Sequence, residues 1–488
     1  MKTHPMFSTK LSQADSLRME LKIATICREM GETGFPLDVE ETNKQIGQLS
    51  TRIDFVDKWC VPEIPPSFKK NGATVEKIYK INGDYTKQVV DWLEDSYPRC
   101  ATISIPSVTI GSMLVSISND VSVGASFNRL ESVSINLGSD KQVKAWLLRN
   151  GWIPTEWNYK KVNGREVRNA FGDKIKTSPK ITLDSLDSLH GLGVLAELIG
   201  YRFKIRHKRS QLEGFLRNLR PDGRVPSLVN TLGTVTRRMT HSKIANVPSP
   251  KKGALWKTMR RVFYAPKGYK IVGCDASQIQ VRGLAHYAWY FGERDFIELL
   301  YAADRGEGDD VHTANGKRAG VTRNESKGIF YGYLFGSGIA KTAAQLGKTV
   351  PETEAIRKKF DKAVPFVSKI VKELKKFWKS NGYILGIAGN KIYVDYEHML
   401  LVYFLQDYEQ FIMKTAICYM YDAFKREGLD TKLVTIQHDE VQLLTADKDV
   451  ARVSEIAEES IAKASRFVGS HCDNVGCAEV GNNWYETH

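Results

Sequence analysis

Residues 435–444, TIQHDEVQLL, constrain this chain more than any other segment. Apolar residues alternate with polar ones on both sides of its centre, which is typical of two strands joined by a tight turn. His438, Asp439 and Glu440 therefore lie at or beside the junction of two half-buried strands. Carboxylates are costly in such a place unless a cation or a substrate compensates their charge. The segment predicts a strand-built floor that carries functional acidic side chains.

A second isolated carboxylate, Asp275, occurs in the same kind of setting. It follows the apolar segment 269–274 and precedes a helix-like segment. Taken alone, an aspartate between a strand and a helix is more often a helix N-cap than a metal ligand. The strand end also supplies a backbone carbonyl, and oxygen ligands of both kinds suit a hard divalent metal.

A cationic segment lies between these two carboxylates in the sequence. Arg323, Lys327 and Tyr331 recur every fourth residue and therefore share one face of a predicted helix. The alternative is a basic face that is merely solvated. Two strand-borne aspartates together with a cationic helix are the equipment for metal-assisted phosphoryl transfer.

The overall composition agrees with a folded, basic protein of several subdomains. The 488 residues carry 70 Lys and Arg against 56 Asp and Glu, a net charge of +14, which is common in chains that bind polyanions but also occurs in others. The seven cysteines are scattered without a CxxC pair, which argues against a zinc site or a disulfide framework and indicates a reducing compartment. No apolar stretch approaches the length of a membrane span.

Periodicity along the chain predicts an α+β architecture with a strand-built floor and helical walls. Alternation rich in Ser and Val, after several prolines, predicts a small β-rich insertion at about 60–133. Helical patterns are expected in the remaining long segments, which are 14–30, 40–59, 139–218, 309–385 with one long basic helix at 352–380, 400–427 and 448–467.

Three segments occur in a fixed order, and they are DASQIQVR at 275–282, RNESKGIFYGYLFGSG at 323–338 and QHDEVQ at 437–442. Their residues and spacing resemble motifs A, B and C of family A (Pol I-like) DNA polymerases, with most similarity to the replicative enzymes of short-tailed bacteriophages. The similarity extends through flanking segments and covers nearly the whole chain except the insertion. Those segments are GRVPSLVNTLGTVTRRMTH, GDDVHT, FLQDYEQ and GNNWYETH.

The resemblance implies a right-hand fold with palm, fingers and thumb. It also implies a template-directed, DNA-dependent DNA polymerase that adds dNTPs to a primer 3′ end, which places the chain in phage-type replication in the cytoplasm of an infected bacterium. The expected subdomains are palm at 1–35, thumb at 36–219 with the insertion at about 60–133, palm at 220–287, fingers at 288–401 and palm at 402–488.

The same resemblance assigns the catalytic residues. Asp275 and Asp439 would hold two Mg²⁺ ions, for which Mn²⁺ could substitute, and Glu440 would lie beside them without being indispensable. Chemistry would be an in-line attack of the primer 3′-OH on the α-phosphorus, with pyrophosphate leaving. Lys327 is the best candidate to protonate that pyrophosphate.

Substrate contacts follow from the resemblance as well. Arg323, Lys327 and His312 would meet the phosphates of the incoming dNTP, and Tyr331 would stack near its sugar and base. At the primer–template end, Arg238 and Gln406 would read minor-groove acceptors shared by all base pairs, with His438 near the primer terminus. The family usually has Gly before this arginine, and Arg237 here would add a charge near the duplex.

Two positions of the expected sugar site depart from the family pattern together. Gln280 stands where the family usually has a Glu that excludes a 2′-OH, and Phe335 stands where that Glu commonly finds a Tyr partner. Losing the phenol removes the donor of a buried carboxylate, and a neutral amide relieves the resulting cost. We expect steric exclusion of ribonucleotides to survive and sugar discrimination to be weaker.

Further expectations concern other activities and partners. No 3′→5′ exonuclease domain is expected, because the only early DxE, at 38–40, matches the opening of the polymerase module. A separate exonuclease is a plausible partner, and the protein is expected to be a monomer without a membrane partner. The insertion would recruit a processivity factor or contact the duplex directly.

Two other functional classes remain as alternatives. A single-subunit RNA polymerase or primase shares a similar floor and cationic helix, but it needs room for a 2′-OH where Gln280 adds bulk. A non-catalytic DNA-binding clamp would not need Asp275, Asp439 and Lys327 together. A metal-dependent nuclease would need a denser carboxylate cluster.

Overall fold

The computed structural model describes residues 4–70, 80–82, 84, 86–88, 90, 107–110, 113–116, 130–250, 253 and 255–487. The chain divides into two compact units, the larger formed by Met1–Gly47 and Lys208–His488 and the smaller by Gln48–His207. Each unit has a buried hydrophobic core of its own.

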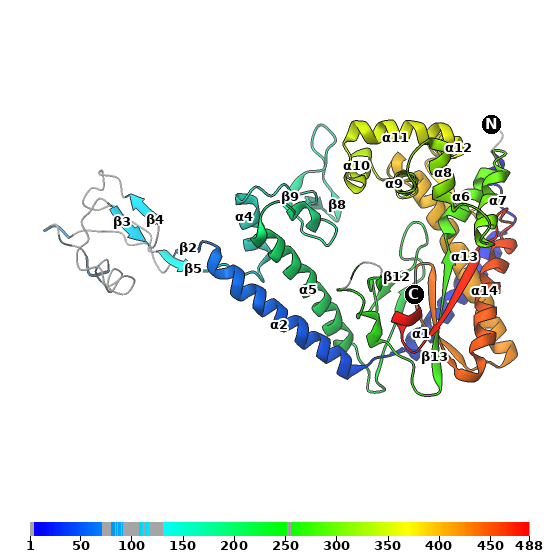
Figure 1. The fold of residues 1–488 in the computed structure, drawn as a ribbon, viewed down its shortest axis with the longest axis horizontal. Coiled ribbons are helices and arrows are strands. Elements are labelled where there is room, and N and C mark those ends of the chain that lie inside the picture. Colours follow the sequence, from blue (N-terminus) through cyan, green and yellow to red (C-terminus); the bar gives the residue numbers. More distant parts are fainter. Residues whose placement is uncertain are drawn as a thin grey trace. The chain divides into compact units, whose positions relative to one another are not determined.

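A four-stranded antiparallel sheet lies at the centre of the larger unit (Figure 1). Its order is β16 (Thr431–Gln437), β17 (Glu440–Ala446), β13 (Tyr269–Ser277) and β18 (Val475–Gly481). Strand β13 is central, and its residue Asp275 faces Glu440 on one neighbour and Cys477 on the other. Both acidic segments predicted from the sequence therefore belong to one sheet.

Four helices of the larger unit pack on this sheet or on one another, namely α1 (Gln13–Thr33), α6 (Ile279–Trp289), α13 (Leu400–Glu427) and α14 (Val450–Phe467). Helix α1 packs against β16, and α14 packs against β13 and β18. Helix α13 is buried over most of its length because α1, α6 and α14 all pack on it.

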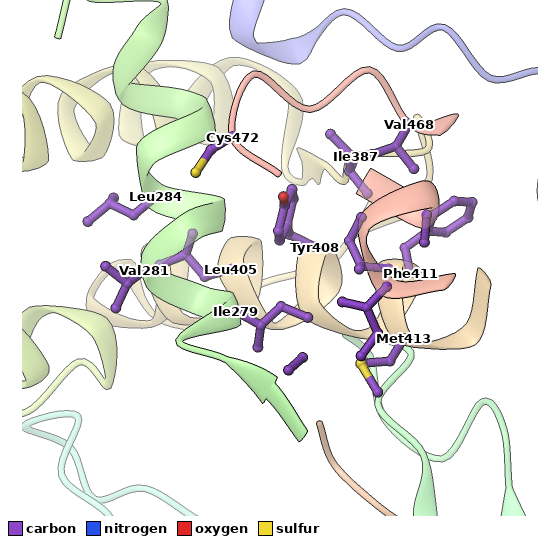
Figure 2. Close-up of a cluster of buried hydrophobic side chains, with 14 of the residues drawn as sticks. Ile279, Val281, Leu284, Ile387, Leu405, Tyr408, Phe411, Met413, Val468 and Cys472 are labelled. Atoms are coloured by element: carbon purple, nitrogen blue, oxygen red, sulfur yellow. The ribbon is translucent and has the colours of Figure 1, made fainter. Parts of the chain in front are cut away.

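Helices α6 and α13 approach each other closely. Figure 2 shows Ile279, Val281 and Leu284 of α6 in the same cluster as Leu405 and Tyr408 of α13. A Cβ atom at residue 283 would lie 2.6 Å from the Tyr408 ring, so this approach requires the glycine found there. The packing fixes the spacing between residues at the start of α6 and residues in the middle of α13.

A group of helices follows α6 in the larger unit, consisting of α7 (Arg294–Asp304), α8 (Val311–Ala319), α9 (Arg323–Leu334), α10 (Ile339–Leu346), α11 (Val350–Ala363) and α12 (Pro365–Asn381). The prediction of a single long helix at 352–380 is wrong, because the helix is interrupted between α11 and α12. Pro365 has no N–H to continue the first helix, and its fixed φ suits the first turn of the second.

Short elements complete the larger unit. Paired strands are β1 (Phe35–Pro36) with β10 (Arg224–Val225), β11 (Leu228–Asn230) with β12 (Thr240–Ser242), and β14 (Ile384–Leu385) with β15 (Lys391–Ile392). Single 3₁₀ turns are η1 (Pro5–Phe7), η4 (Arg260–Val262), η5 (Glu397–Met399), η6 (Asp447–Asp449) and η7 (Trp484–Thr487).

The smaller unit contains most of α2 (Val39–Glu63), all of α4 (Asp140–Arg149), the 3₁₀ turn η2 (Leu186–Leu189) and part of α5 (Val194–Arg217). Its paired strands are β2 (Ser67–Lys70) with β5 (Leu130–Val133), β3 (Ser107–Ile110) with β4 (Met113–Ser116), β6 (Trp157–Tyr159) with β9 (Lys176–Pro179), and β7 (Lys161–Val162) with β8 (Arg165–Glu166). The first four strands fall in the range predicted to be β-rich, and the rest of that insertion lies outside the described residues.

Helical patterns were expected in 139–218, and this prediction is wrong for residues 157–179. Two antiparallel strand pairs occupy this stretch, and the chain reverses at Gly164 and Gly172, whose φ angles are 77° and 85°. Both φ values lie in the left-handed region that glycine adopts without strain. Helices and strands together confirm the α+β class. Of the described helices, none is both long and apolar enough to cross a membrane.

Candidate active site

Asp439 lies in a two-residue hairpin turn. His438 and Asp439 connect β16 to β17, and His438 has a φ of 59° in the left-handed region. The backbone carbonyl of Asp439 accepts a hydrogen bond from the Ala276 amide at 3.0 Å. This bond ties the turn to the end of β13, immediately beyond Asp275.

Asp275 belongs to a strand and does not cap a helix. Strand β13 continues to Ser277, and the N-cap of α6 is Gln278, which has a left-handed backbone with a φ of 52°. The alternative that Asp275 is only an N-cap is therefore wrong.

The electrostatics of Asp439 show that acidic groups gather at this point. The half-buried carboxyl loses hydration, and this desolvation, together with the negative charges of Glu409 and Asp275, raises its pKa to about 8. Among the described residues, no group of three or more His, Cys, Asp and Glu side chains is arranged to hold a metal ion. Asp275 and Asp439 could hold a Mg²⁺ ion, because that ion usually takes one or two carboxylates and completes its shell with water and substrate phosphates.

Glu440, next in sequence, has a different environment. Its buried carboxylate accepts from Arg260 Nη1 at 3.0 and 3.1 Å, from Trp484 Nε1 at 2.6 Å and from Gln442 Nε2 at 2.7 Å. The Arg260 guanidinium also lies 4.4 Å from the Trp484 ring centroid. These contacts hold Glu440 firmly within the protein.

The cationic helix predicted from the sequence is α9. Arg323 and Lys327 are exposed, and Lys327 Nζ lies 5.8 Å from the centroid of the Tyr331 ring. Arg323 Nε is 3.0 Å from Oδ2 of Asp310, the residue that caps α8. Burial would raise the pKa of Asp310, but hydrogen bonds from Thr313 and Arg323 lower it overall.

His312 joins this group from the first turn of α8. Its ring lies 5.4 Å from the Tyr331 ring, and burial lowers its pKa to about 4, with Asp310 opposing and the charges of Lys327 and Arg323 adding to the shift. The ring is therefore neutral near pH 7. Its Nδ1 atom is buried and has no hydrogen-bond partner in the part of the chain that the structure describes.

The three residues expected at the primer terminus line one cavity. Arg238, Gln406 and His438 share a space of about 370 Å³ with neighbours from the 234–246 segment and α13. Gln406 Oε1 accepts a hydrogen bond from Thr236 at 3.3 Å. The ring of His438 meets that of His241 edge to face at 5.8 Å.

Arg237, expected to add a charge near the duplex, turns into the protein instead. Its φ is 58°, and its guanidinium donates to Asp407 Oδ1 at 3.0 Å, to Asn390 Oδ1 at 2.7 Å and to Ser16 Oγ at 3.2 Å. The expectation is wrong because a fully buried carboxylate, Asp407, takes this charge.

Gln280 and Phe335, the two residues that depart from the family pattern at the expected sugar site, make contacts that the sequence did not reveal. The Gln280 amide donates to Glu409, a buried residue of α13. Phe335 is 52% exposed and stacks on Tyr331 at a centroid distance of 5.5 Å. Glu409 lies in the segment FLQDYEQ, three residues after Gln406. This helical spacing places the two residues on one face of α13 and could have indicated that Glu409 belongs to the site.

Comparisons with known proteins show the family of this chain. The family model described as DNA polymerase family A matches residues 121–486. The DNA-directed DNA polymerases of Enterobacteria phage T3 and Escherichia phage T7 are 26% and 25% identical over 403 and 402 residues, in each case 75% of this chain and 54% of the relative. The chain therefore spans about half the length of these curated relatives.

A solved structure is similar as well. It is the POL domain of Pol1 from M. smegmatis in complex with DNA primer-template and dNTP, with a TM-score of 0.67 and 18% identity. The match covers 96% of this chain and 70% of that one, and it supports the fold.

Proposed function

The chain belongs to DNA polymerase family A, and from this premise we propose that it is a template-directed DNA polymerase that extends a primer 3′ end with dNTPs. The observation that carries the proposal is the convergence of Asp275 and Asp439 with a cavity lined by Arg238, Gln406 and His438. The family generally uses divalent metal ions, and we infer two Mg²⁺ ions, with Mn²⁺ as a substitute.

Asp275 and Asp439 would hold these ions. When bound there, Mg²⁺ would polarise the primer hydroxyl and the triphosphate. The raised pKa of Asp439 reflects carboxylates brought together in a partly dehydrated place, and such a place favours a divalent cation. Glu440 supports the turn through Arg260 and Trp484 and acts as a positioning residue.

The α9 face would orient the triphosphate. Arg323 and Lys327 are exposed cations one helical turn apart, and Lys327 Nζ would donate a proton to the departing pyrophosphate. His312 is neutral near pH 7, so it would contact the phosphates as an N–H donor and not as a cation. Tyr331, beside Lys327 and His312, would stack against the nucleotide.

The cavity around Arg238 would receive the minor-groove edge of the primer–template end. Arg238 and Gln406 would meet acceptors that every base pair presents there, so they would check pair geometry and not sequence. The net charge of +14 supports salt-dependent binding of the duplex backbone.

The wider setting is inferred from the relatives. Similarity to phage polymerases supports replication in the cytoplasm of an infected bacterium. We also propose that the β-rich insertion at about 60–133 recruits a processivity partner and that the polymerase is a monomer. Co-purification with and without residues 60–133 would test the recruitment.

Primer extension tests the function directly. The wild type should extend a primed template with Mg²⁺ and dNTPs, and Asp439→Ala should reduce the rate by about 10³-fold or more while duplex binding persists. An exposed acidic control, Asp447→Ala, should retain the wild-type rate. Extension with rNTPs in preference to dNTPs would favour the RNA polymerase alternative, and duplex binding without any extension would favour the clamp.

A further inference from the structure

Glu409 is the centre of a hydrogen-bond network between α6, α13 and the 234–241 segment. Its Oε1 atom accepts from Arg238 Nη2 at 2.7 Å and Nε at 3.1 Å and from Gln410 Nε2 at 3.1 Å. Its Oε2 atom accepts from the Gln280 amide. The side chain is 2% exposed, so this carboxylate depends on its protein partners for compensation.

The hydrogen bond to Glu409 fixes which way the Gln280 amide points. A carboxylate can only accept hydrogen bonds, so the NH₂ group of Gln280 must face Glu409 and the carbonyl Oε1 must face away. That Oε1 atom is buried and lacks a hydrogen-bond partner among the described residues. A buried acceptor of this kind costs free energy until a donor reaches it.

The location of this acceptor indicates the donor. Gln280 follows Asp275 by five residues, and Glu409 is close enough to Asp439 for its charge to act on that carboxyl. The pair therefore lies beside the proposed metal site, where the sugar of an incoming nucleotide would bind. The hydrogen-bond donors of a nucleotide sugar are its hydroxyl groups.

Resting on the proposed function, we propose that Glu409 is a specificity-determining positioning residue. It holds Gln280 so that Oε1 accepts a hydrogen bond from a hydroxyl of the incoming nucleotide sugar, and it links this site to Arg238 at the primer end. Helix α6 packs closely on α13, as Figure 2 shows for neighbouring apolar residues, and this packing keeps Gln280 next to Glu409.

The proposal also explains why position 280 carries an amide. A carboxylate at 280 would lie against Glu409, and two buried like charges in contact repel strongly. The carboxylate of this site belongs to Glu409 on α13, and its neutral partner is the amide of Gln280 on α6. Exchanging the two residues should therefore restore the catalytic efficiency and the stability that either single substitution disturbs.

The test is a charge-exchange cycle with Gln280→Glu, Glu409→Gln and the double variant. Gln280→Glu should lower kcat/KM for dATP by about 10- to 100-fold, and the double variant should recover most of this loss. Gln278→Glu, an exposed neighbour on the same segment, is the matched control and should keep the wild-type value. A double variant no better than Gln280→Glu would overturn the proposed coupling.

Nucleotide analogues identify the hydroxyl. If Oε1 accepts from the 2′-OH, Glu409→Gln should lower the kcat/KM ratio of ATP to dATP by about 3- to 10-fold. If it accepts from the 3′-OH, the ratio of dATP to ddATP should fall by a similar factor. Both ratios unchanged would overturn the positioning role.

Thermal unfolding of the same variants separates this proposal from the proposed function. Gln280→Glu should lower the midpoint and the double variant should restore it, whether or not the protein extends a primer. Wild-type protein without polymerase activity, but with this reciprocal effect on stability, would count against the function and leave the Glu409–Gln280 coupling supported. Independent, additive effects on stability would overturn the coupling itself.

Discussion

Arg237 and Asp407 form an ion pair in the interior of the larger unit, with Nε of the guanidinium 3.0 Å from Oδ1 of the carboxylate. Asp407 is fully buried and also accepts from the Ile387 amide at 3.1 Å and from Asn390 Nδ2 at 2.9 Å. Arg237 provides this charge although its backbone has a φ of 58°, a conformation unfavourable for any residue with a Cβ.

This pair yields a prediction about stability. Arg237→Ala leaves Asp407 buried without its cation, so the free energy of unfolding should fall by about 3–5 kcal/mol. Arg237→Gly removes the same cation but also relieves the left-handed backbone, so it should be about 1 kcal/mol less destabilising. Urea unfolding of both variants would measure the difference, and an Arg237→Ala protein as stable as the wild type would contradict the assignment.

A second prediction concerns the leaving group. If Lys327 protonates the pyrophosphate, Lys327→Ala should lower kcat by about 10²- to 10⁴-fold. Arg318→Ala removes an exposed cation of α8 and is the matched control, with kcat expected to stay near that of the wild type. Single-turnover extension would measure both rates. Equal, small losses in the two variants would show that Lys327 contributes only general positive charge.

The motifs predicted the strands and the helix that carry these residues, because the signals are local. A carboxylate after a buried strand and cations at helical spacing are visible in a few neighbouring residues, and they located Asp275, Asp439 and Lys327 on the elements where the structure has them. The break at Pro365 was visible too, but helical periodicity on both sides of it favoured a single helix.

Glu409 and the inward turn of Arg237 depend on contacts that no local pattern contains. Gln280 and Glu409 are 129 residues apart in sequence, and Arg237 and Asp407 are 170 apart. Each pair meets only because α13 packs centrally in the larger unit. Charged residues at such positions look like solvated helix faces until the helix is known to be buried.

The pH dependence of stability should reveal the buried ring of His286. Burial, with the neighbouring His471 adding to the shift, lowers the pKa of His286 to about 3, and its Nδ1 accepts from the His471 amide at 3.1 Å. In the unfolded chain this imidazole takes up a proton near pH 6.5, whereas in the folded protein it stays neutral to much lower pH. The stability that the neutral ring contributes is therefore complete above pH 6.5 and is lost as the pH falls toward 3.

The loss from His286 should reach about 3 kcal/mol at pH 4. His286→Asn keeps an acceptor near the His471 amide but does not titrate, so its stability should fall less steeply between pH 6.5 and 4. Chemical unfolding at several pH values would measure the two slopes. Parallel curves for the variant and the wild type would contradict a neutral, buried His286.

The last prediction separates two adjacent carboxylates. Glu440 is saturated by donors from Arg260, Trp484 and Gln442, whereas Asp439 shares its surroundings with Asp275 and Glu409. Glu440→Gln should therefore lower the free energy of unfolding by about 3 kcal/mol or more, because Arg260 is left buried without its anion.

Activity of the same variant should change much less than its stability suggests. Among molecules that remain folded, we expect Glu440→Gln to keep kcat within about tenfold of the wild type, against a loss of about 10³-fold or more for Asp439→Ala. Primer extension normalised to the folded fraction, measured at saturating Mg²⁺, would make this comparison. If Glu440→Gln were as inactive as Asp439→Ala at unchanged stability, Glu440 would have to act directly at the reacting groups.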